Sequence, residues 1–230
     1  GHRIASDSPS TKMGLPEVLL GILPAWGGTT RLPRLVGVQA SLDLMLSGRQ
    51  VSSSTARRMG LIDEVVPADL FREKVAAFAT AVGKSGRKRG ARRSLLRRLM
   101  DGTLPGRRLI LFMAKKRVMA QTGGHYPAPL KILEVVRRSA SKSLEKALEI
   151  EAKAAGELVT SSVCKNLIHV FHLREEARKG TGVDDETVEP GQVEYLAVLG
   201  AGVMGGGIAQ LAAYRGIHVR MKDINHEAIS

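Results

Sequence analysis

Aromatic residues and cysteine are scarce in this chain of 230 residues, and it contains no run of 18 apolar residues. Because aromatics make up only 3%, the composition argues against nucleic-acid modules that stack bases on aromatic platforms. A single cysteine, Cys164, excludes an internal disulfide framework and fits a reducing compartment. The missing apolar run excludes a transmembrane helix. From these absences together we expect an intracellular protein that does not bind nucleic acid.

The apolar content of 43% is enough for a sizeable core, and the length fits one to two domains. Residue patterns predict an α/β protein, with strands at 3–5, 11–15, 61–66, 195–199 and 217–221 and helices at 38–46, 68–82, 130–138, 143–160, 163–178 and 208–214. Local signals predict a helix N-cap at Thr29 or Thr30, and a turn bracketed by Pro127 and Pro129. The six histidines and one cysteine show no metal-ligand spacing, so no metal site is expected.

The formal net charge of +13 is concentrated in one stretch. Residues 84–117 hold thirteen basic residues and one acid, and they are expected to be helical in two pieces broken at Gly102–Gly106. Because the excess does not cover a whole face of the fold, a general nucleic-acid surface is disfavoured. A solvated helical hairpin and a surface for phosphate groups or an anionic membrane are both open interpretations.

Residues 180–193 form the clearest boundary in the chain. The segment is short and acidic, and it contains glycine and proline, which is typical of an interdomain linker. The predicted domains are therefore 1–179 and 194–230.

The second domain opens with a glycine pattern that is typical of dinucleotide binding. An apolar strand runs into GAGVMG at 200–205, a helix and a second strand follow, and Asp223 lies 23 residues after Gly200. Gly200 permits a tight turn, Gly202 lets backbone N–H groups approach a pyrophosphate, and Gly205 lets helix and strand pack closely. Asp223 can accept hydrogen bonds from a ribose 2′-hydroxyl and would repel a 2′-phosphate, which favours NAD over NADP. The alternative is a glycine-rich turn without a ligand.

The informative acid near the start of the chain is Glu17, which stands between a proline and an apolar run in GLPEVLLG at 14–21. Apolar surroundings disfavour charge on a carboxyl group, which suits proton transfer. From these residues alone, a surface glutamate in a turn is the alternative interpretation.

Longer strings of sequence resemble known families. GLPEVLLGILPAWGGTTRLPRLVG at 14–37 and LMLSGRQVSSSTARRMGLIDEVVP at 44–67 resemble the enoyl-CoA hydratase/isomerase (crotonase) family. Segments 124–136 and 161–180 resemble the tail of that domain in a subgroup that is fused to a 3-hydroxyacyl-CoA dehydrogenase, and 200–225 resembles the start of the dehydrogenase. The resemblance implies the C-terminal part of a crotonase-like spiral domain with a helical tail, then the first β-α-β unit of a Rossmann NAD-binding domain.

The resemblance also implies roles for individual residues. Glu17 matches the second of two glutamates that act on the water added to a 2-enoyl-CoA, and in related isomerases this position alone shuttles the proton. Met204 and Asp223 match NAD-contacting positions. Glu175 matches an acidic position that contacts substrate, for which a solvated helix charge is the alternative. Trp26 is expected to pack beside the acyl or CoA loop.

The family's first glutamate and both oxyanion donors would precede Gly1, and the dehydrogenase His–Glu pair would follow Ser230. We therefore expect an internal piece of a multifunctional fatty-acid oxidation enzyme that is inactive alone. The resemblance implies acyl-CoA substrates, NAD, a thiolase β subunit as partner, and a location in the bacterial cytoplasm or the mitochondrial matrix. The alternative is a catalytically inactive partial NAD-binding module whose basic segment binds CoA or an anionic membrane.

Overall fold

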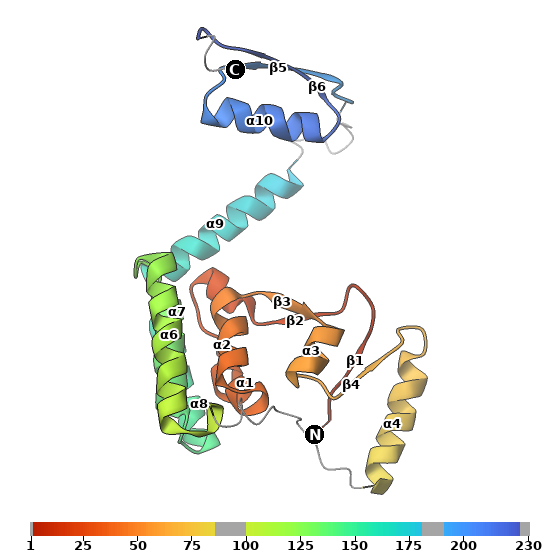
Figure 1. The fold of residues 1–230 in the computed structure, drawn as a ribbon, viewed down its shortest axis with the longest axis vertical. Helices are drawn as coiled ribbons and strands as arrows, with labels where there is room; N and C mark the ends of the chain where they lie inside the picture. Colours follow the sequence, from red (N-terminus) through yellow and green to blue (C-terminus); the bar gives the residue numbers. More distant parts are fainter. Residues whose placement is uncertain (1, 86–99, 181–190, 226–230) are drawn as a thin grey trace. The chain divides into compact units, whose positions relative to one another are not determined.

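The computed structural model describes residues 2–85, 100–180 and 191–225. The chain divides into two compact units, Gly1–Glu175 and Glu176–Ser230 (Figure 1). Residues 86–99 of the basic stretch and residues 181–190 of the expected linker lie outside the described residues. The expectations for those two segments therefore stay predictions.

The first unit contains two small sheets. β1 (Ile4–Ser6) pairs in parallel with β4 (Glu64–Val66), and β2 (Lys12–Gly14) pairs antiparallel with β3 (Gln50–Ser52). β4 is shorter than the strand expected at 61–66. The backbone N–H of Arg3 donates to the Asp63 carboxylate at 2.8 Å, and the N–H of Asp63 donates to the Arg3 carbonyl at 2.8 Å, so the chain is still turning there.

Four α-helices accompany these strands in the described part of the first 85 residues. They are α1 (Gly28–Val36), α2 (Val38–Ser47), α3 (Ser53–Met59) and α4 (Phe71–Ser85). The helix predicted at 38–46 is confirmed, and it ends because Gly48 adopts a left-handed conformation with φ of +64°. Leu42, Leu44 and Met45 of α2 are buried in the core of the unit.

A helical tail follows, made of α6 (Leu104–Thr122), α7 (Pro127–Ser139), α8 (Leu144–Val159) and α9 (Ser162–Lys179). α6, α7 and α8 lie side by side (Figure 1), and α7 contacts α1 and α2. Apolar side chains of these three helices complete the core: Ile110, Val118, Ile132, Val135, Val136, Ala154 and Leu158.

Two expectations about this tail are wrong. Pro127 is the first residue of α7 and Pro129 lies inside its first turn, where a missing N–H costs nothing, so the two prolines start the helix and do not bracket a turn before it. Gly106 lies inside α6, whose N-cap is Thr103, so the break between the basic helices ends before Gly106. A Cβ on Gly106 would be 2.3 Å from the carbonyl oxygen of Met100, which explains the glycine.

The second unit holds β5 (Tyr195–Leu199), α10 (Val203–Tyr214) and β6 (His218–Lys222). The two strands are parallel, with Tyr195 opposite His218 and Leu199 opposite Lys222, and α10 covers one face of the pair (Figure 1). A parallel pair joined by a helix is the βαβ unit that the glycine pattern predicts.

Across residues 2–85, 100–180 and 191–225, no helix combines the length and the apolar character that crossing a membrane requires.

Candidate functional site

Glu17 lies in a short 3-10 helix, η1 (Pro16–Leu20), that proline starts and glycine ends. The helix ends at Gly21, whose φ of +75° lies in the left-handed region that glycine adopts readily. The N–H of Ile22 donates to the Glu17 carbonyl at 3.2 Å. The carboxyl group is partly buried, and its Oε2 is buried without a hydrogen-bond partner among the described residues. An acceptor kept away from bulk water and left unpaired suits an incoming hydroxyl or C–H group.

The helical tail contacts the turn that follows Glu17. A Cβ on Gly21 would be 3.0 Å from Leu167 Cδ1 and 3.2 Å from Cys164 Cα, so the start of α9 lies directly against this glycine. Cys164 is fully buried, as expected of a small apolar residue. The position of η1 therefore depends on residues about 150 positions away in the sequence.

A second tail residue, Glu151 of α8, has no exposed surface and contacts the start of α1. Its Oε1 accepts the N–H of Gly27 at 2.5 Å, and its Oε2 accepts the Thr29 hydroxyl at 2.5 Å and the Thr30 N–H at 3.0 Å. The sequence analysis missed this glutamate. The available signal was its position on the apolar face of a helix, three or four residues from Ala147 and Ala154.

The contact also corrects the N-cap expected at Thr29 or Thr30. Gly27 is the N-cap residue, no local side chain caps the helix, and both threonines lie buried inside α1. A carboxylate from a distant helix replaces the local cap, because it can accept from several of the N–H groups that a helix start leaves unpaired.

Trp26, on the loop between η1 and α1, is 92% exposed, so the described residues do not cover it, and its packing beside the acyl or CoA loop stays a prediction. Leu19 of η1 is 60% exposed. Two large apolar side chains near Glu17 thus face outward, which is the kind of surface that a ligand or another part of a protein covers.

The glycine loop has the geometry that its sequence predicts. Gly200 adopts φ of +104°, and a Cβ on Gly205 would lie 1.8 Å from the Gly200 carbonyl oxygen, so α10 starts in direct contact with the end of β5. Nothing lies within 4 Å of a Cβ built on Gly202, the N-cap of α10. The space over the loop and the N–H groups of the helix start fit a pyrophosphate.

Asp223 lies just after β6 and faces this loop. Its Oδ2 accepts the N–H of Ala201 at 2.5 Å and its Oδ1 accepts the N–H of Asn225 at 2.9 Å. The hydrogen bond from Ala201, followed by that from Asn225, lowers the pKa of Asp223 below its ordinary value. Met204, in the first turn of α10, is 79% exposed beside the same loop.

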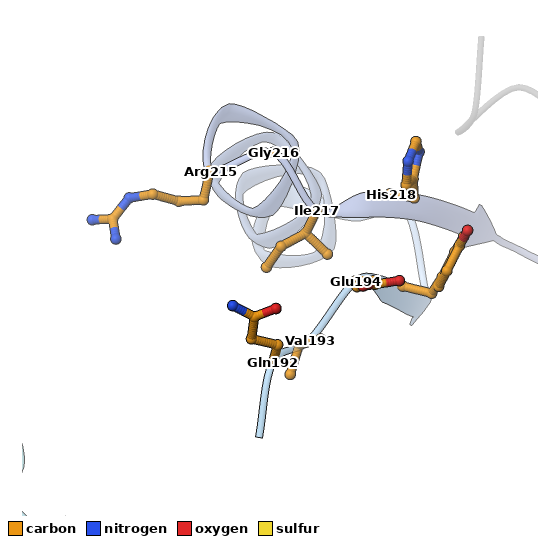
Figure 2. Close-up of a pocket in the computed structure, with 8 residues that line it drawn as sticks. Gln192, Val193, Glu194, Arg215, Gly216, Ile217 and His218 are labelled. Carbon is orange, nitrogen blue, oxygen red and sulfur yellow. The ribbon is translucent and has the colours of Figure 1, made fainter. Parts of the chain in front are cut away.

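A pocket of about 530 Å³ lies at the other edge of this small sheet (Figure 2). Its walls are 192–195 and 215–218, at the amino ends of β5 and β6, where the rings of Tyr195 and His218 stack at 5.2 Å. Ligands of parallel α/β sheets bind at the carboxyl ends of the strands. The pocket therefore lies at the opposite end of the strands from the glycine loop.

Glu175 lies in α9 and is partly exposed. It follows Cys164, which contacts the Glu17 segment, by eleven residues, or about 16 Å along a helix axis. The structure therefore does not place Glu175 at the turn that touches Gly21, and its role stays a prediction.

Comparison with known families assigns both parts of the chain. Residues 2–104 match Enoyl-CoA hydratase/isomerase, and residues 195–230 match the NAD binding domain of 3-hydroxyacyl-CoA dehydrogenase. The chain thus holds a crotonase-type hydratase/isomerase segment with a helical tail, followed by the start of a Rossmann NAD-binding domain. The fold class expected from the sequence is confirmed.

Curated relatives match the entire chain. Fatty acid oxidation complex subunit alpha of Shewanella amazonensis is 43% identical, and that of Shewanella loihica is 42% identical, each over 230 residues. The chain is a homologue of these alpha subunits over its whole length and spans 32% of theirs. Among solved structures, carnitinyl-CoA hydratase from Mycobacterium avium matches 74% of this chain and 51% of its own, with 22% identity and a TM-score of 0.46.

Proposed function

We propose that the full-length protein adds water to 2-enoyl-CoA thioesters and oxidises the resulting 3-hydroxyacyl-CoA with NAD. The observation that carries this proposal is Glu17, whose partly buried carboxyl group with an unpaired oxygen lies within the hydratase/isomerase segment. In the hydration, the hydroxyl of water joins the β-carbon and a proton joins the α-carbon. Glu17 moves that proton. The same group can shuttle a proton between carbons of a 3-enoyl-CoA, so isomerase activity is part of the proposal.

For the second activity we propose that residues of the glycine loop hold NAD. NAD held there would supply the acceptor for the hydride of the 3-hydroxy carbon, while the hydroxyl proton would leave to a base. The N–H groups at the start of α10 would bind the pyrophosphate, Gly202 leaves room for it, and Met204 in the first turn of α10 would contact the dinucleotide. The Asp223 carboxylate has acceptor capacity beyond its backbone contacts, and it would accept the ribose hydroxyls. Glu175 is proposed to contact the acyl-CoA.

The experiment is a pair of assays on the full-length protein. One follows loss of the conjugated thioester of a short 2-enoyl-CoA, and the other follows NADH formation from a 3-hydroxyacyl-CoA. We expect turnover in both. A protein that binds NAD but turns over neither substrate would instead be the inactive NAD-binding module.

Partners and location complete the proposal. The relatives are named as subunits of a complex. The partner we propose is a thiolase β subunit, because a thiolase consumes the 3-ketoacyl-CoA that the oxidation releases. Since acyl-CoA and NAD chemistry of this kind runs inside cells, we propose the bacterial cytoplasm or the mitochondrial matrix. Co-purification of the full-length protein with a thiolase tests the first point.

The basic segment favours a further candidate role at an anionic membrane. On α6, the apolar residues Leu109, Phe112 and Met113 are exposed beside Lys115 and Lys116, and Phe112 is 68% exposed. Apolar and basic side chains on one surface suit anionic lipid headgroups. Co-sedimentation of the full-length protein with anionic but not zwitterionic vesicles, reduced by salt, is the expected result.

A further inference from the structure

We propose that Glu151 is a positioning residue for the hydratase site. It fixes the start of α1, and through it the loop between η1 and α1, in the arrangement that the Glu17 carboxyl group needs. The inference rests on the hydratase function proposed for Glu17.

Hydrogen bonds occupy both carboxylate oxygens of Glu151. Glu151 is fully buried, and both of its oxygens accept hydrogen bonds from one short segment, Gly27, Thr29 and Thr30. The donors are two backbone amides and one hydroxyl at the positive end of the α1 dipole. A buried carboxyl group with all its partners in one helix start fixes that start tightly, because moving it would leave polar groups buried and unpaired.

The start of α1 contacts residues on both sides of Glu17. A Cβ on Gly28 would lie 2.3 Å from Pro24 Cβ and 3.5 Å from Leu15 Cδ1, so the first turn of α1 packs against residues on either side of η1. The N–H of Thr29 also donates to the Pro24 carbonyl at 3.3 Å. A shift of the helix start is therefore transmitted to Leu15, two residues before Glu17, and to the loop after it.

Glutamine has the size of glutamate, but its NH₂ group donates where the carboxylate accepts. In Glu151→Gln, the new NH₂ group faces either the N–H of Gly27 or the hydroxyl of Thr29 and the N–H of Thr30. At that position a donor then opposes a donor. Because misplacement of a reacting group by about 1 Å costs on the order of 100-fold in rate, even a small shift of η1 is measurable.

The experiment compares Glu151→Gln with Glu157→Gln in the full-length protein. The control lies on the same helix and undergoes the same change, but Glu157 is exposed and pairs with Lys131 at 2.8 Å. For Glu151→Gln we expect hydratase kcat to fall about 10- to 100-fold, KM to change less than about threefold and dehydrogenase turnover to stay unchanged. Hydrogen exchange at the amides of 27–31 should be at least about tenfold faster. The control should match the wild type in all four measurements.

Faster exchange with unchanged hydratase kcat overturns the positioning role, although the contact itself stands. A joint fall of both activities with thermal stability also overturns it, since that pattern indicates a purely structural residue. Wild-type protein without hydratase turnover refutes the proposed function, and the exchange data still report the contact separately. If Glu151→Gln does not fold, Thr29→Val replaces it: this variant removes one donor, and kcat equal to the wild type overturns the inference.

Discussion

The Asp223 carboxylate accepts the backbone N–H of Ala201 at 2.5 Å and so joins the end of β6 to the loop that follows β5. In the proposed function the Asp223 carboxylate has two roles. It shapes the glycine loop, and it presents its remaining lone pairs to a ribose.

Asp223→Asn in the full-length protein should weaken NAD binding by about 10- to 100-fold, the range for a lost hydrogen bond to a charged group. NADP binding should weaken less, because the substitution also removes a charge that repels the 2′-phosphate. Calorimetric titration of both cofactors measures the difference. Equal losses would mean that Asp223 shapes the loop without contacting the ribose.

The same contact predicts how NAD affinity depends on pH. The Ala201 N–H lowers the pKa of Asp223, so the contribution of the carboxylate is complete above the ordinary value of about 4 and is lost as pH falls through a still lower pKa. The difference in NAD affinity between wild type and Asp223→Asn should therefore be constant from about pH 5 to 8. A difference that fades between pH 7 and 5 would contradict this assignment.

Gly205→Ala should abolish NAD binding, because the new Cβ would lie 1.8 Å from the Gly200 carbonyl oxygen and the loop would have to move. We expect a loss of at least about 100-fold in NAD affinity, with hydratase turnover unchanged. Gly207→Ala is the matched control: it lies in the same helix, and no atom lies within 4 Å of its Cβ. Equal NAD affinity in the two variants would show that close packing at Gly205 is unimportant.

Glu17→Gln should lower hydratase kcat by at least about 100-fold, since the amide keeps the size but cannot transfer the proton. KM should change little, because the carboxyl group acts on a proton and does not anchor the CoA. Dehydrogenase turnover should be nearly intact. Glu73→Gln, at an exposed glutamate of α4, provides the control. A kcat within about threefold of wild type would favour the surface-turn interpretation of Glu17.

Features that depend on neighbouring residues were predictable from the sequence. The glycine loop is one, because its turn, its close approach and its helix start are encoded within 200–205. The end of α2 at Gly48 is another. In both, local backbone geometry decides the structure, and tertiary packing only adds to it.

Features that depend on distant contacts were not predictable. Glu151 replaced the local cap expected at Thr29 or Thr30, because a carboxylate from α8 reaches the start of α1 in the folded unit. The strand expected at 61–66 shortened because Asp63 bonds to Arg3. Such contacts arise only from the packed structure, and the residue pattern around each site gives no indication of its partner.

The hydrogen bond between Gly27 and Glu151 spans 124 positions of the chain. A ribosome that adds about 5–20 residues per second needs about 6–25 s to synthesise that interval. During this time the start of α1 exists without the acceptor that later fixes it. The segment that carries Glu17 therefore emerges before α8 but reaches its final form only after α8 has been synthesised, so a nascent chain arrested before residue 151 should contain the Glu17 turn in an unfinished state.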